Sequence, residues 1–103
     1  MKKILRRGAA NLQKGIETVG GKLYLTNQRL VFEAHKSNIQ GGITELELTD
    51  INSTNLKWTK FLGLIPLFPN SLAVILNNEK EYHYVLFARK AWKSDINEQR
   101  EKV

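Results

Sequence analysis

Hydrophobic and polar residues alternate with a period of two along much of this chain, which is the pattern of β-strands with one face toward a core. The clearest alternation is at residues 44–49, where Leu46 and Leu48 share one face and polar residues occupy the other. Residues 71–76 are almost entirely apolar, so we expect this strand to be covered on both faces. Further runs predict strands at 8–12, 22–26, 29–35, 51–58 and 81–87.

Short polar or glycine-rich steps separate these runs. Asn27-Gln28 favours a hairpin between two strands, and Gly20-Gly21 is interpreted as a break before residue 22. Asp50 is interpreted as a bend, and the asparagines of residues 77–80 are expected to form a turn at positive φ. The sequence therefore predicts antiparallel strands joined by short connections.

The period changes after Arg89, where neither proline nor glycine occurs. Trp92 and Ile96 stand four positions apart, on one side of a helix of about 13 residues. The apolar stripe of this helix is narrow, so we expect Trp92 to fill the end of a core. The predicted fold is mainly β, with a single C-terminal α-helix: a seven-stranded antiparallel sheet curls into a bent, partly open barrel that the helix caps.

Several segments resemble the GRAM domains, which are members of the pleckstrin-homology-like (PH-like) superfold. Residues 20–32 (GGKLYLTNQRLVF) resemble the signature hairpin of this family, and 46–51 (LELTDI) resemble its strand and bend. Residues 65–66 with 69–72, and then 89–92 (RKAW), follow in the family's order. The resemblance spans residues 8 to about 98 and implies a seven-stranded bent barrel with a C-terminal helix.

The resemblance also implies a domain organisation and a general role. We expect a single GRAM or PH-like domain over residues 8–103, after a basic segment at 1–7 whose order the sequence leaves open. The resemblance implies a stand-alone small protein of bacterial type. It further implies that the domain binds membrane lipids or proteins.

Charge is distributed unevenly along the 103 residues. The formal net charge is +6, and residues 1–36 hold eight cations against two acids, whereas residues 37–103 hold eight of each sign. Such asymmetry indicates an anionic partner, either lipid headgroups or nucleic acid, although a solubilising basic surface explains it equally. The composition, 42% hydrophobic and 25% charged, is that of a folded domain and excludes a disordered chain.

The resemblance implies that basic residues near the first hairpin contact an anionic headgroup. The hairpin loop at residues 15–19 contains Glu17 and no base, which departs from lipid-binding relatives. The candidate residues for an anionic ligand or lipid are Lys14, Lys22, Arg29, Lys57 and Lys60.

Residues 61–68 form a second candidate site, because six of these eight residues are large and apolar. Pro66, Pro69 and Gly63 predict a loop without regular structure in this part of the chain, residues 59–70. Leaving the six side chains in water would forgo about 9–18 kcal/mol, so the loop must fold onto its own barrel, contact a protein or a second copy, or enter a membrane. The candidate contact residues are Phe61, Leu62, Leu64, Ile65, Leu67 and Phe68.

Catalytic and metal-binding patterns are absent from the sequence. His35 and His83 are interpreted as surface strand residues, and Glu45 and Glu47 as solvated positions of an alternating strand. The chain has no cysteine, no phosphate-binding glycine loop, no dinucleotide glycine pattern and no nucleophile elbow. We therefore expect no enzyme, no catalytic residue, no metal, no cofactor and no small-molecule substrate.

The remaining patterns concern localisation and partners. The basic start leads into no apolar run, and no stretch approaches the ~20 apolar residues of a spanning helix, so we expect a cytoplasmic protein at the inner face of a membrane. Nucleic acid is disfavoured as a partner. Only Tyr24 and Trp58 stand among basic side chains, where their rings could stack on nucleobases. The predicted function is docking to a membrane surface or an anionic, phosphoinositide-like lipid through the basic first third and the 61–68 loop. The alternative is protein binding or self-association through that loop.

Overall fold

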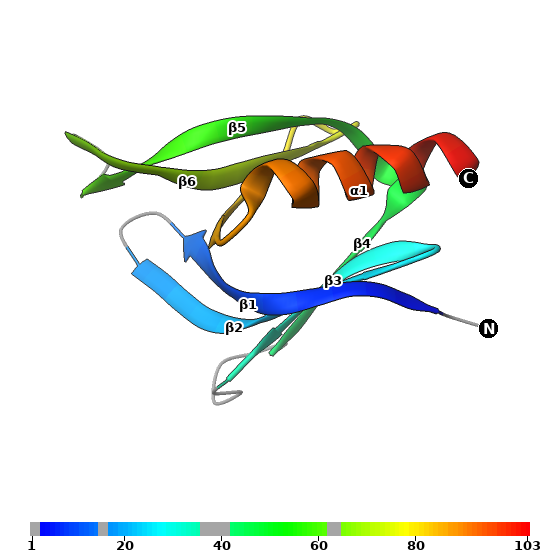
Figure 1. Ribbon diagram of the computed structural model, residues 1–103, viewed down its shortest axis with the longest axis horizontal. Helices are drawn as coiled ribbons and strands as arrows, with labels where there is room; N and C mark the ends of the chain where they lie inside the picture. The colour runs from blue at the N-terminus through cyan, green and yellow to red at the C-terminus, as the bar shows by residue number, and fades with distance from the viewer. Residues whose placement is uncertain (1–2, 15–16, 36–41, 62–64) are drawn as a thin grey trace.

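In the residues that it describes, the computed structural model contains seven antiparallel strands and one C-terminal helix (Figure 1). It describes all residues except 1–2, 15–16, 36–41 and 62–64, and it describes the backbone alone at 14, 17, 58–61 and 65–70. The elements are β1 (Ile4–Lys14), β2 (Glu17–Thr26), β3 (Arg29–Ala34), β4 (Ile43–Glu47), the 3-10 turn η1 (Leu48–Asp50), β5 (Ile51–Phe61), β6 (Ile65–Leu76), β7 (Glu81–Leu86) and α1 (Arg89–Lys102).

The strands form one curled sheet in the order β4-β3-β2-β1-β7-β6-β5. Strand β1 lies at the centre and pairs with β2 on one side and β7 on the other. The two outermost strands, β4 and β5, are consecutive in the chain and joined by η1, while α1 packs against β5, β6 and η1 (Figure 1). The predicted mainly β fold, a bent and partly open barrel capped by the helix, is therefore confirmed.

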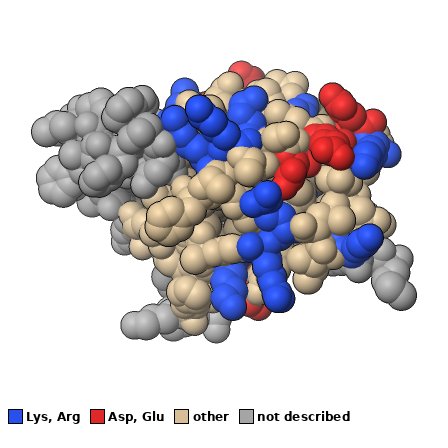
Figure 2. Space-filling model, in the orientation of Figure 1, with Lys and Arg blue, Asp and Glu red and all other residues tan. Residues whose placement is uncertain are grey.

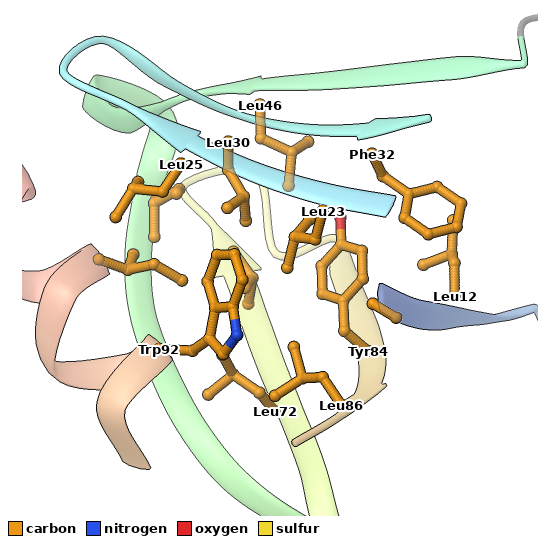
Figure 3. Packing of buried hydrophobic residues seen from close by; sticks show 14 of the residues in the cluster. Leu12, Leu23, Leu25, Leu30, Phe32, Leu46, Leu72, Tyr84, Leu86 and Trp92 are labelled. Carbon is orange, nitrogen blue, oxygen red and sulfur yellow. The ribbon is translucent and has the colours of Figure 1, made fainter. Parts of the chain in front are cut away.

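The core lies inside the curl of the sheet and is closed by the inner side of α1. Trp92 and Ile96 are 3% and 0% exposed, as their four-residue spacing predicted. Trp92 points from α1 toward the inner faces of the strands, where the rings of Phe32 and Tyr84 pack with centroids 5.9 Å apart (Figure 3). The apolar residues buried with them are Ala10, Leu12, Leu23, Leu25, Leu30, Leu46, Leu48, Ile51, Leu72, Val74 and Leu86.

Two expectations about irregular segments are wrong. Strand β2 runs through Gly20-Gly21 without a break, because Gly21 is the point where β3 approaches closely: a Cβ there would lie 2.2 Å from the Glu33 carbonyl oxygen. Residues 61 and 65–68 are not part of an irregular loop, since Phe61 ends β5 and Ile65 begins β6, whereas residues 62–64 lie outside the described part of the chain. Its prolines are tolerated because the first part of β6 pairs with β5 alone, and β7 pairing starts at Ser71.

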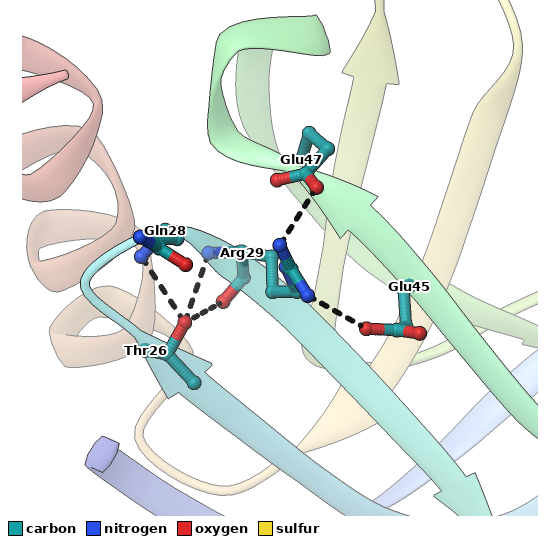
Figure 4. A network of polar contacts seen from close by, with 5 residues as sticks. All are labelled: Thr26, Gln28, Arg29, Glu45 and Glu47. Atoms are coloured by element: carbon teal, nitrogen blue, oxygen red, sulfur yellow. Dashed lines mark hydrogen bonds and ion pairs between the residues drawn. The ribbon is translucent and has the colours of Figure 1, made fainter. Parts of the chain in front are cut away.

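The turns that connect the strands agree more closely with the predictions from sequence. At the β2–β3 turn, Thr26 Oγ1 accepts hydrogen bonds from the backbone N–H groups of Gln28 and Arg29 at 3.1 and 2.9 Å and donates to the Arg29 carbonyl (Figure 4). At the β6–β7 turn the positive φ belongs to Glu79 (72°), whereas the sequence predicted an asparagine. Ala88, also left-handed at φ 55°, turns the chain from β7 into α1.

The buried hydroxyl of Tyr84 yields a stability prediction. This side chain is 0% exposed, and its hydroxyl has no hydrogen-bond partner among the described residues. Leaving a buried polar group unpaired costs about 1–3 kcal/mol, so Tyr84→Phe should leave the free energy of unfolding unchanged or raise it by about 1 kcal/mol in urea titrations. A decrease of more than about 1 kcal/mol in the free energy of unfolding would contradict a Tyr84 hydroxyl without a hydrogen-bond partner.

The same tyrosine gives this prediction a pH dependence. Burial, with a smaller effect of Tyr82, raises the pKa of Tyr84 above its ordinary value of about 10. The native state therefore keeps the phenolic proton at a pH where the unfolded chain releases it, and this lowers the stability of the wild type as the pH rises above about 10. Tyr84→Phe removes that loss, so the stability difference between the two proteins should widen in alkaline solution.

Candidate functional site

Strand β1 and helix α1 lie side by side on one face of the molecule (Figure 1). Arg6 of β1 connects them: its Nε donates to Asp95 Oδ2, and its guanidinium lies 5.6 Å from the centroid of the Trp92 ring. Gly8, two residues further along β1, also faces the Trp92 indole. These contacts fix the first half of the helix alongside the first half of the strand.

This arrangement collects basic side chains from the two ends of the sequence. On the face shown in Figure 2, Lys and Arg gather over β1 and the start of α1, while Asp and Glu lie over the later part of the helix. Within residues 3–13 and 87–95 the only acid is Asp95. We call the six cations of these two segments the basic strip: Lys3, Arg6, Arg7, Arg89, Lys90 and Lys93.

The charges of the basic strip are largely uncompensated. Arg6 is paired with Asp95, but no carboxylate among the described residues pairs with the other five cations. Arg89 Nη1 donates to the Lys57 carbonyl at 2.8 Å, which anchors the helix start to β5 without neutralising its charge. The first turn of α1 contains no acid, so the positive end of the helix dipole adds to the same field.

A large apolar side chain adjoins the basic strip. Phe87, between β7 and α1, is 90% exposed, more than any other large hydrophobic residue that the structure describes. Ile4 and Leu5, in the part of β1 that carries Arg6 and Arg7, are 54% and 39% exposed. An aromatic side chain in water beside lysines and arginines is the combination found at membrane–water boundaries and at protein interfaces.

The sequence-derived candidates whose side chains are described, Lys22, Arg29 and Lys57, are not brought together. Arg29 lies between Glu45 and Glu47, 3.3 and 3.0 Å from their carboxylates, so its charge is compensated within the β3–β4 pair (Figure 4). Lys22 and Lys57 are exposed on β2 and β5, which are not neighbours in the sheet.

The other candidates lie partly or wholly outside the described residues. The side chains of Lys14, Lys60, Phe61, Ile65, Leu67 and Phe68 lie outside the described part of the chain, as do Leu62 and Leu64 entirely.

The groups capable of acid–base chemistry lie on the surface. His35 is exposed just after β3, and His83 Nε2 is 3.1 Å from Glu81 Oε1, two residues away on the same strand. Glu45 and Glu47 hold Arg29, as described above. Among the described residues, no three His, Cys, Asp or Glu side chains converge as metal ligands would, and no helix has the length and apolarity to cross a bilayer.

Sequence reasoning located half of the basic strip and missed the other half. The charge excess of residues 1–36 includes Lys3, Arg6 and Arg7. Lys90 and Lys93 belong to a helix sequence that also carries Asp95, Glu98 and Glu101, and Phe87 ends a strand pattern, so none of the three attracts attention locally. The one local signal was the order of charges in the helix, where three cations precede the first acid, Asp95.

No protein-family model and no curated protein matches this sequence, but solved structures share its fold. The C-terminal domain of an unknown protein from Leishmania infantum superposes with a TM-score of 0.79 at 15% identity, covering 96% of this chain and 84% of that one. The Vps36 N-terminal PH domain gives a TM-score of 0.71 at 15% identity, covering 98% of this chain and 80% of that one.

The DH/PH region of p115-RhoGEF gives a further likeness. An N-terminally truncated linker-DH/PH fragment superposes with a TM-score of 0.74 at 16% identity, covering 99% of this chain but 30% of that one. At these identities the likeness concerns the fold alone. The chain therefore has a PH-like fold.

Proposed function

We propose that this chain is a non-catalytic docking module that attaches to an anionic membrane surface through the basic strip and Phe87. The observation that carries the proposal is the concentration of six cations against one carboxylate on β1 and the start of α1, beside an aromatic side chain that is 90% exposed. An anionic lipid surface complements both features, because it attracts the cations and accepts the aromatic ring at its interface. A place at the inner face of the cytoplasmic membrane follows from this proposal.

Electrostatic attraction is expected to contribute more to membrane binding than burial of apolar surface does. Each Lys or Arg near an anionic leaflet contributes about 1 kcal/mol, so the five cations without a carboxylate partner contribute up to about 5 kcal/mol. Burying the Phe87 side chain adds about 1.5–3 kcal/mol. Because the Debye length is about 8 Å at physiological ionic strength, salt should weaken the binding strongly.

The protein should bind different lipids in the order of the total negative charge of their headgroups. The cations of the basic strip are distributed along a strand and a helix, which suits a charged surface better than a single headgroup. A phosphoinositide should therefore bind better than phosphatidylserine only to the extent that it carries more charge. Membership of the GRAM family and a bacterial-type origin remain predictions from the sequence resemblance.

Vesicle sedimentation tests the proposal. Wild-type protein should bind phosphatidylcholine vesicles that contain phosphatidylserine and should not bind phosphatidylcholine alone. Arg7→Gln with Lys90→Gln removes two exposed cations of the basic strip, so it should weaken binding about 30-fold. Phe87→Ala should weaken it about tenfold or more.

The matched control removes two exposed cations elsewhere. Lys80 lies in the β6–β7 turn and Lys102 at the end of α1, so Lys80→Gln with Lys102→Gln makes the same change in net charge. This control should retain most of the binding. Equal loss in both double variants would mean that net charge alone attracts the protein, and the basic strip would lose its role.

A second role rests on the apolar composition of residues 61–68, which we propose as a protein-binding or self-association surface. Sedimentation equilibrium over a range of concentrations tests it without lipid. A stable dimer would favour this alternative, whereas a monomer that partitions onto anionic vesicles would favour membrane docking.

A further inference from the structure

The outer face of the sheet, opposite the core, carries a groove across β2, β1 and β7. It encloses about 300 Å³, and we define it by the residues that line it: Ala9, Asn11, Gly21, His35, Val85 and Phe87. His35 also borders a second, wider hollow that contains Lys22, Tyr24 and Glu33. The outer groove is therefore mostly apolar, with Asn11 and His35 as polar lining residues, and it opens toward charged residues.

Small residues create this groove. Ala9 of β1 contributes only a methyl group to its floor, whereas a side chain on Gly21 would point to the other face of the sheet, toward Phe32 in the core. Next to them, a Cβ on Gly20 would lie 3.1 Å from Asn11 Oδ1 and 3.6 Å from His35 Cδ2, so both polar side chains stand directly over the strand at this point. His35 thus forms one wall, and Val85 with Phe87 forms the other.

The walls of the outer groove could hold an aromatic side chain of a ligand. A volume of about 300 Å³ lies at the lower end of the range for binding pockets, which is suitable for one large side chain. A guest ring could contact the imidazole of His35 and the ring of Phe87, and aromatic pairs contribute about 0.5–1.5 kcal/mol beyond burial. Asn11 is exposed and can donate and accept hydrogen bonds with a peptide backbone.

The charged residues around the outer groove indicate which residues should flank the aromatic side chain of the ligand. Arg7 lies two residues before Ala9 on the same face of β1, and Lys22 is the cross-strand partner of Ala9. Lys90 follows Phe87 by three residues at the other end, and Glu33 is the acid among the rim residues described. Carboxylates on either side of a bound ring would meet these cations.

We propose that the outer groove binds an acidic segment of a partner protein, with one aromatic side chain of that segment between His35 and Phe87. The outer groove shares Phe87 with the membrane-docking surface, and Arg7 and Lys90 at its rim belong to the basic strip, but the proposal does not depend on membrane binding. The chemistry that recognises the partner is an aromatic residue flanked by aspartate or glutamate, in an extended peptide.

Titration of the ¹⁵N-labelled full chain, followed by NMR, tests the proposal with two synthetic probes. The first is the capped pentapeptide Asp-Glu-Phe-Asp-Glu, and the second replaces its phenylalanine with alanine. The phenylalanine probe should bind about tenfold or more tightly than the alanine probe, because the ring is buried only in the first complex. Amide shifts should centre on 9–11, 20–21, 35 and 85–87.

Two variants separate this site from the membrane site. His35→Ala should abolish most of the preference for the phenylalanine probe while leaving vesicle binding intact. Lys90→Gln should weaken both peptides and vesicles but keep the preference. Both positions are exposed, so circular dichroism should show an unchanged fold.

Three results would overturn the proposal. Equal affinity for the two peptides would show that charge alone attracts them, and shifts confined to residues outside the outer groove would place the peptide elsewhere. A single-stranded oligothymidine that gives the same shifts at lower concentration than the phenylalanine probe would assign the groove to nucleic acid. In each case vesicle binding could still stand, so the two proposals fail independently.

Discussion

Trp92→Ala is expected to lower the free energy of unfolding by about 3–5 kcal/mol, the cost of removing a large buried aromatic side chain. The indole is 3% exposed and fills the space between α1 and the inner faces of the strands. It also contacts Arg6 and faces Gly8, so its removal loosens the attachment of the helix to β1. Since whole domains are stable by about 5–15 kcal/mol, this variant should be close to unfolding at 37 °C. Urea denaturation followed by circular dichroism measures the effect.

Phe87→Ala is the matched control for this variant. It removes an aromatic side chain only five residues away, but one that is 90% exposed, so stability should change by less than about 0.5 kcal/mol. If Trp92→Ala fails to fold, Trp92→Phe can be measured in its place, because it leaves a smaller cavity and so lowers the free energy of unfolding by less. Comparable effects of Trp92→Ala and Phe87→Ala would contradict a helix that is held by its indole.

Gly21→Ala is expected to have the second large effect, a loss of about 3 kcal/mol or more from overpacking. The added methyl would lie 2.2 Å from the Glu33 carbonyl oxygen and 2.8 Å from Phe32 Cζ. The oxygen belongs to the backbone of β3, the neighbouring strand, so relief requires the β2–β3 pair to separate locally. Thermal unfolding should show a clear decrease in Tm.

Gly8→Ala is the control for this substitution. A Cβ at this position of β1 would lie 3.6 Å from the nearest Trp92 carbon, which is an ordinary contact distance. Replacing this glycine should leave stability unchanged or raise it by about 0.4–1 kcal/mol, because alanine restricts the unfolded chain. A similar Tm decrease in both variants would show that the close approach of β3 to Gly21 is not the cause.

Periodicity was sufficient to predict the curled sheet and the position of the helix. Leu46 is buried on the face of β4 where the alternation placed it, and Trp92 and Ile96 are buried at helical spacing. Leu48 is buried too, but it lies in η1, because β4 ends at Glu47 and not at Thr49. Gly20-Gly21 was misinterpreted because glycine at a turn and glycine at a close approach look alike in sequence. Only the pairing of β2 with β3 distinguishes the two.

The candidate site was less predictable because it depends on contacts between distant residues. Arg29 looked available for an anion, but Glu45 and Glu47 of the next strand compensate its charge. The basic strip joins residues near position 6 to residues near position 93, and the Arg6–Asp95 contact that aligns them is invisible to local patterns. A surface patch of this kind can be recognised only after the topology is known.

The most direct measurement is paramagnetic line broadening of the ¹⁵N-labelled protein on phosphatidylserine nanodiscs that contain a headgroup spin label. Membrane docking through the basic strip requires broadening of the amides of residues 3–7 and 87–93, with smaller effects on β3 and β4. Added salt should reverse the broadening, because the binding is mainly electrostatic. Broadening centred on any other surface, or none on anionic nanodiscs, would contradict this account.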